Sequence, residues 1–118
     1  MVTSMTQELI ERFHNAMLGI YDAAGKLKKP YYPRRFLKMV NDHGGKEAAD
    51  ILLLPTANYA TGLGELFEHG GRDALRKSVE YLVLSNPWRV LFTDNQLAEA
   101  RKRMKAMGII SLPVEDAL

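Results

Sequence analysis

The 118-residue sequence contains no cysteine. This absence excludes disulfide bonds, thiolate metal sites and cysteine nucleophiles, and it leaves no sign of an oxidising compartment. Long apolar stretches are also missing, because the longest aliphatic run, Ile51–Leu54, is far shorter than the ~20 residues that span a bilayer. The amino terminus has no basic segment followed by an unbroken apolar run. We therefore expect a cytoplasmic protein without a membrane segment.

Net charge of either sign is small. Sixteen lysines and arginines stand against fourteen acidic residues, which leaves a formal charge of +2. Such a balance attracts nucleic acid only weakly, so any electrostatic argument must rest on local clusters of charge. The hydrophobic fraction of 47% is high enough for one core that folds without covalent cross-links.

Apolar residues recur at helical spacing along the chain, and no segment alternates as a β-strand does. Ser4 and Gln7 have the spacing of a capping box, and Gly25 supplies a stop. These signals predict a first helix over residues 5–24. Its apolar face comprises Leu9, Ile10, Phe13, Met17, Ile20, Tyr21 and Ala24.

Prolines and glycines predict the limits of the next two helices. Pro33 stands where a first helical residue would be, and the pair Gly44-Gly45 ends the second helix. A third, strongly apolar helix runs from Lys46 and cannot continue past Pro55. The apolar face of the second helix comprises Phe36, Leu37 and Val40.

The middle of the chain is less regular. Thr61 is a suitable N-cap for a short fourth helix, although glycines weaken helix formation there. The following stretch forms either one helix from Asp73 or two pieces separated at Ser78. Asn86 and Pro87 predict a further cap and first turn. That turn is expected to present Trp88, Val90 and Leu91 to the core.

The segment between Thr93 and Gly108 contains every signal of one helix. Thr93 and Gln96 have capping-box spacing, and Gly108 ends the pattern. The apolar stripe comprises Leu97, Ala100 or Arg101, Met104 and Met107. The basic residues Arg101, Lys102, Arg103 and Lys105 suit the negative end of the helix dipole. We expect the remaining basic residues to project from the face opposite the stripe. Such a face is more often solvated than functional.

The sequence thus predicts an all-α fold: a compact single-domain bundle of about five to seven short helices, with long first and last helices. Residues 1–108 form the expected domain. Residues 109–118 form an apolar tail that either folds back on the domain or docks on a partner.

Residues 44–70 and 75–108 resemble a family of small bacterial proteins of unknown activity. The resemblance covers about residues 12–108 and departs from the family pattern at 58–71. The matching positions are Phe36 and Met39, then Gly44 and Gly45, then Leu82, Val83, Leu84, Leu91, Phe92, Thr93, Ala100 and Arg101. The resemblance implies a compact helical fold and brings no activity, cofactor or catalytic residue.

No set of residues predicts catalysis or metal binding. His14, His43 and His69 do not lie within one helical turn of one another, and the latter two stand beside glycines where helices are expected to end. Glu65 and Glu68 share a helical face, but no third acid or phosphate-binding loop accompanies them. We interpret the chain as a non-enzymatic protein without a cofactor or metal.

The strongest functional signal is a basic segment. Residues 26–38 carry six lysines and arginines and no acid, and two tyrosines interrupt the run. Cations bind phosphates through counterion release, and tyrosines stack on exposed bases. The predicted nucleic-acid contacts are Lys28, Lys29, Tyr31, Tyr32, Arg34, Arg35 and Lys38, joined by Arg101, Lys102 and Lys105 if the last helix lies beside the segment.

Two structural alternatives compete with this hypothesis. One tyrosine packs under the segment while the cations stay solvated, or Tyr32 and Pro33 only fix the entry to the second helix.

Two function classes therefore remain. The first is a nucleic-acid-binding module, or an accessory to bacterial nucleic-acid machinery. The second is a protein-interaction module, acting as an inhibitor, an adaptor or a homodimer. Its predicted partner-binding residues are Trp88, Ile109, Ile110 and Leu112.

Overall fold

Six α-helices and two short 3-10 helices form the part of the chain that the computed structural model describes, residues 4–109. For residues 59–61 the description is limited to the backbone. The elements are α1 (Met5–Gly25), α2 (Arg34–His43), α3 (Gly45–Leu52), α4 (Tyr59–Ala74), η1 (Leu75–Lys77), α5 (Val79–Val83), η2 (Trp88–Leu91) and α6 (Asp94–Ala106). The predicted all-α bundle is confirmed.

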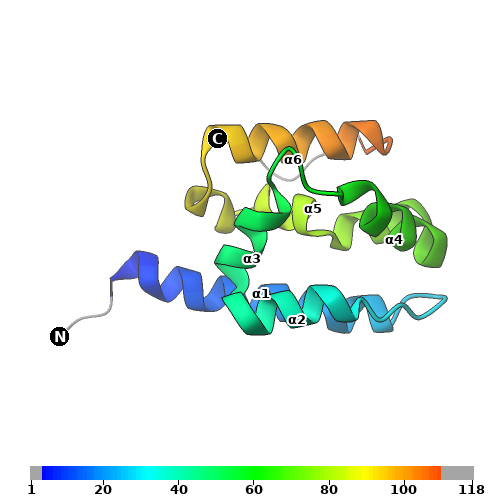
Figure 1. Ribbon diagram of the computed structural model, residues 1–118, viewed down its shortest axis with the longest axis horizontal. Coiled ribbons are helices and arrows are strands. Elements are labelled where there is room, and N and C mark those ends of the chain that lie inside the picture. Colours follow the sequence, from blue (N-terminus) through cyan, green and yellow to red (C-terminus); the bar gives the residue numbers. More distant parts are fainter. Residues whose placement is uncertain (1–3, 110–118) are drawn as a thin grey trace.

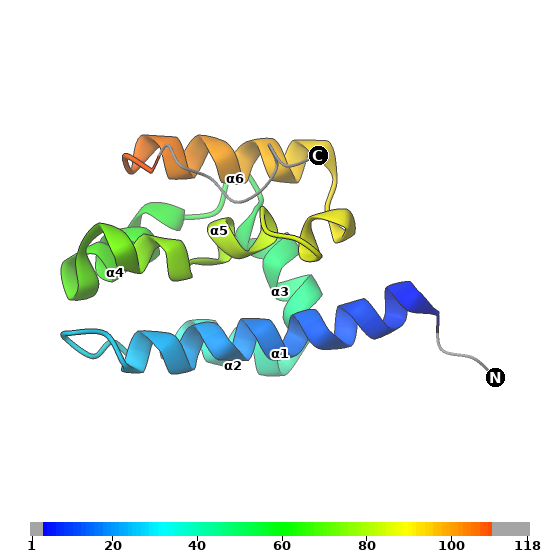
Figure 2. The same cartoon turned by 180° about the vertical axis from the view of Figure 1, so that it is seen from behind.

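The helices are arranged in layers (Figure 1). α1 and α2 lie side by side and antiparallel at one edge of the molecule, and α3 leads away from them to the rest of the bundle. α4 and α5 form the middle, and α6 lies along the opposite edge. The view from behind has the same order of layers (Figure 2). The connector between α1 and α2 therefore lies at the edge opposite α6.

The last helix has the full capping box that the sequence predicts, and the first helix has one of the two hydrogen bonds of its predicted capping box. The Ser4 hydroxyl accepts a hydrogen bond from the Gln7 amide at 3.0 Å. Thr93 and Gln96 form a reciprocal capping box, with bonds of 3.1 Å and 2.9 Å. Gly108 has φ of +85°, a left-handed conformation that glycine adopts at little cost, and the chain leaves α6 there.

The middle of the chain contains the main departures from the prediction. α4 begins at Tyr59 rather than after Thr61, and with 16 residues it is longer than the 13-residue α6. It is kinked at Gly71, where φ is +71°. The break at Ser78 is confirmed, because its hydroxyl accepts from the Tyr81 amide at 3.2 Å and donates to the Leu75 carbonyl at 2.7 Å.

The two proline signals are each displaced by one residue. Pro33 occupies the cap position of α2 rather than its first helical position. Pro87 likewise caps η2, in place of Asn86. Proline has no amide hydrogen, so its ring is tolerated in either position at the start of a helix.

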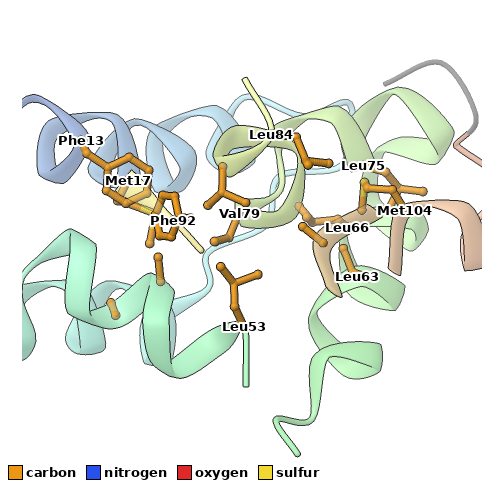
Figure 3. Close-up of a cluster of buried hydrophobic side chains, with 14 of the residues drawn as sticks. Phe13, Met17, Leu53, Leu63, Leu66, Leu75, Val79, Leu84, Phe92 and Met104 are labelled. Atoms are coloured by element: carbon orange, nitrogen blue, oxygen red, sulfur yellow. The ribbon is translucent and has the colours of Figure 1, made fainter. Parts of the chain in front are cut away.

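The core runs between the layers (Figure 3). Phe13 is fully buried, and its ring meets those of Trp88 and Phe92 edge-on, with centroids 5.7 Å and 5.3 Å away. Further along, Leu63, Leu66, Leu75 and Met104 complete the packing between α4, η1 and α6. Val90, expected in the core, is 75% exposed, because the tight η2 turn presents Trp88 and Leu91 to the core instead.

Where α1 and α3 cross, their backbones are in contact. The Gly45 amide donates a hydrogen bond to His14 Nδ1 at 2.9 Å. A Cβ atom on Gly45 would lie 2.6 Å from the Cα atom of His14. Only glycine allows this approach, which fixes the angle at which α3 leaves the α1–α2 layer.

Replacing Gly45 with alanine should therefore destabilise the protein by about 1–3 kcal/mol, since neither backbone can yield locally. Gly19, in the middle of α1, is the matched control, because a Cβ there meets no atom within 4 Å. Gly19→Ala should stabilise the protein by about 0.5–1 kcal/mol through helix propensity. Urea unfolding of both variants measures the difference, and equal effects would contradict the proposed close crossing.

Candidate nucleic-acid interface

The connector between α1 and α2, residues 26–33, is held to the bundle by its backbone. The Tyr31 amide donates to the Ala24 carbonyl at 2.9 Å, and the Lys29 amide donates to the His69 carbonyl at 3.1 Å. Leu27 packs beside Gly70, where an added Cβ would lie 2.9 Å from a Leu27 methyl group. The connector is therefore anchored to α4 as well as to α1.

The two tyrosines of the connector differ in their surroundings. Tyr31 is half-buried, and its ring lies against the imidazole of His69 with centroids 4.9 Å apart. Burial, and then the nearby charge of Glu65, raise the pKa of Tyr31 above its ordinary value. Tyr32 is 56% exposed, and its ring lies beside that of Tyr21. Tyr31 thus packs under the connector, whereas Tyr32 keeps a large part of its surface open to solvent.

His69 supports the connector from α4. Its Nδ1 atom lies 2.9 Å from the carbonyl oxygen of Lys29 and 3.1 Å from that of Pro30. Because carbonyl oxygens only accept, this nitrogen carries the proton and donates to them. The sequence predicts a helix end at the glycine beside His69, but α4 continues to Ala74 and His69 contacts a segment 40 residues earlier in the chain.

The cations of the connector and of the first turn of α2 face solvent. Lys28, Lys29, Arg34 and Arg35 are exposed, and none forms an ion pair with a carboxylate in the described part of the chain. Lys38 differs, since its ammonium group lies 2.6 Å from the Asp42 carboxylate. That hydrogen bond is the main cause of the lowered pKa of Asp42.

The predicted cations of the last helix lie elsewhere. α6 and the connector occupy opposite edges of the molecule in both views (Figures 1 and 2). Lys102 and Lys105 are exposed on α6, and Arg101 is half-buried. The ten basic and tyrosine residues proposed from the sequence therefore do not form one continuous surface.

Arg103 does not belong to the exposed basic face at all, which corrects the sequence prediction. Its side chain is 0% exposed. The guanidinium donates to the Leu52 carbonyl at 2.6 Å and to the Leu54 carbonyl at 2.8 Å. It also pairs with Glu80 at 3.0 Å and with Glu99 at 2.8 Å. Arg103 thereby joins α6 to α5, to the last residue of α3 and to the segment that follows α3.

The spacing of residues in the sequence indicates that Arg103 is buried. Arg103 lies three residues after Ala100 and four before Met107, so it falls within the apolar stripe of α6. Glu99, one turn earlier, is positioned to pair with it. The neighbouring basic residues of the helix instead indicated an exposed basic face that included Arg103.

Glu80 is the acidic partner deepest in the protein. Its side chain is 8% exposed. Burial raises the pKa of Glu80, and the hydrogen bond from Arg103 opposes that shift. The pair is therefore a structural link inside the bundle and not a solvated ion pair.

The residues predicted for protein interaction are only partly within the described chain. Trp88 is half-buried against Phe13, and Ile109 is 1% exposed within the core. Ile110 and Leu112 lie outside the described residues. The two described members thus face the core rather than an open surface.

Comparisons of the chain with protein-family models, with curated proteins and with solved structures find no match. The resemblance to a family of small bacterial proteins therefore stays a prediction. Residues 4–109 contain no cluster of three histidine or acidic side chains suited to a metal ion. They also contain no helix that combines the length and the apolar character needed to cross a bilayer.

Proposed function

We propose that this protein is a non-enzymatic module that binds nucleic acid through the connector between α1 and α2. The observation that carries the proposal is the group formed by Lys28, Lys29, Arg34 and Arg35, which are all exposed and have no carboxylate partner among the described residues. Cations without protein partners can contact phosphates without first breaking an ion pair. Each such contact releases condensed counterions of the nucleic acid, which favours binding. We call these four residues, two in the connector and two in the first turn of α2, the connector cations.

The attachment of the connector favours such a role. Hydrogen bonds to Ala24 and His69 fix its backbone, so the cations are presented on an ordered scaffold and less entropy is lost on binding. Phosphate contacts carry no sequence information by themselves. We therefore expect binding with little sequence preference.

Tyr32 favours single-stranded over double-stranded nucleic acid as the ligand. Tyr32 is 56% exposed, and it lies between the connector cations in sequence. Unpaired bases stack on exposed aromatic rings whatever their identity, whereas the bases of a duplex are already stacked on each other. Tyr31 is not part of this interaction, because its ring packs on His69. A cytoplasmic location and an accessory role in nucleic-acid machinery complete the proposal.

The test removes the connector cations. In a variant with Lys28, Lys29, Arg34 and Arg35 all changed to glutamine, affinity for a labelled single-stranded oligonucleotide should fall steeply. The slope of log affinity against log salt should become shallower by up to about 3, since each contact with a single strand contributes about 0.7. Fluorescence anisotropy at several salt concentrations measures both quantities.

The matched control changes Lys102 and Lys105 of α6, which are also exposed, to glutamine. That variant should keep most of the affinity and nearly the full salt slope. A control loss in log affinity about half that of the connector variant, in proportion to two charges removed against four, would show that net charge alone governs binding. Unchanged binding in the connector variant would reject the proposed surface.

A further inference from the structure

A cavity of about 590 Å³ separates the α1–α2 layer from α4 and α5. Its volume falls within the range of about 300–1,000 Å³ that is typical of small-molecule sites. The walls are mainly apolar, and they include Ile20, Phe36, Met39, Leu63, Leu66 and Val79. Side chains from four helices thus line a partly open space suited to a hydrocarbon group.

The charged groups available at the cavity are positive and lie on α2. Arg34 and Arg35 line it from the first turn of α2, and both are exposed without a described carboxylate partner. On the α5 side, Glu80 also lines the cavity, but its carboxylate is held by Arg103 at 3.0 Å. The cations available to a ligand therefore belong to α2, beside the apolar walls.

The other polar group on the α5 side offers little to a polar ligand, and the remaining polar side chains of the lining are Tyr31 and Tyr32 of the connector and Asn58 before α4. The Ser78 hydroxyl lines the cavity, yet it already donates to Leu75 and accepts from Tyr81. A nucleobase inserted at that depth would need free donors and acceptors for its edge, or lose the hydrogen bonds that it makes with water. A hydrocarbon chain has no such requirement.

We propose that the cavity binds a small amphiphilic anion, namely an unbranched hydrocarbon chain that ends in a carboxylate. The chain lies between α2 and α4, and the carboxylate accepts hydrogen bonds from the guanidinium groups of Arg34 and Arg35. The inference does not rest on nucleic-acid binding, because the cavity is a separate observation. Arg34 and Arg35 are nevertheless shared by both proposals, and Tyr32 also lines the cavity.

The experiment titrates the full chain calorimetrically with octanoate, decanoate and decan-1-ol, each below its aggregation limit. Decanoate should bind about fifteenfold more tightly than octanoate, because each of its two additional buried methylenes contributes about fourfold in affinity. In Arg34→Gln/Arg35→Gln, decanoate affinity should fall at least tenfold, whereas decan-1-ol affinity should stay within about twofold. The alcohol therefore also reports whether the cavity is intact in the variant.

Lys28→Gln/Lys29→Gln distinguishes this proposal from the proposed function. These lysines do not line the cavity, so decanoate binding should be unchanged while oligonucleotide binding weakens. Absence of saturable decanoate binding would overturn the inference, as would equal affinities for octanoate and decanoate. Adenosine monophosphate that binds more tightly than decanoate would identify a nucleotide site instead and would equally overturn it.

Discussion

Replacing Arg103 with methionine is expected to lower the free energy of unfolding by about 3–5 kcal/mol, the usual cost of breaking a buried ion pair from one side. Methionine nearly fills the volume but provides no donor. The carbonyls of Leu52 and Leu54 would lose their hydrogen bonds, and the Glu80 carboxylate would remain buried without its cation. Urea unfolding followed by circular dichroism measures the loss.

Acid should reduce this penalty. Burial favours the protonated form of Glu80 in the folded protein and so raises its pKa. The contribution of such a group to stability is fully present below its unfolded pKa and is lost as pH rises through the folded pKa. Without Arg103, the folded pKa of Glu80 rises further, so Arg103→Met should destabilise the protein less at acid pH than at neutral pH.

Lys102→Met is the control, because Lys102 is the exposed neighbour on α6. Its effect should stay within about 0.5 kcal/mol. A similarly small effect of Arg103→Met would mean that the guanidinium is solvated, which would contradict its place inside the bundle.

Phe13→Ala should cost a comparable amount, about 3–5 kcal/mol, because truncation of a buried aromatic side chain leaves a cavity. The ring is fully buried, and it contacts both Trp88 and Phe92. These contacts attach α1 to η2 and to the residues that precede α6. Thermal and urea unfolding give the size of the loss.

Phe67→Ala is the matched control, because it removes the same side chain from an exposed position. Its side chain on α4 is 47% exposed, so Phe67→Ala should cost much less than Phe13→Ala. If the two variants lost equal stability, the burial assigned to Phe13 would be wrong.

Local signals predicted the helices well. The capping boxes, the glycine stops and the apolar repeats all depend on residues within a few positions of one another. α1 begins at the expected residue and ends one residue later than expected, and Thr93 caps α6 as predicted. The kinked α4 was harder to predict, because its glycines have low helix propensity and tertiary packing decides whether a helix forms.

The site depends on contacts that no local pattern contains. Tyr31 packs on a histidine that lies 38 residues later, and Arg103 contacts the carbonyl of Leu52, 51 residues earlier. The basic segment itself was visible in the sequence. Only the fold shows that Tyr31 supports the connector, that Arg103 is internal and that a cavity lies beneath Arg34.

An NMR titration with a single-stranded oligonucleotide tests the proposed surface most directly, because backbone amide shifts report the contact residue by residue. The largest shifts should fall on residues 26–36, including Tyr32, and should diminish as salt is added. Residues of α6 should hardly change. Shifts centred on Lys102 and Lys105, or no shifts at low salt, would contradict binding through the connector.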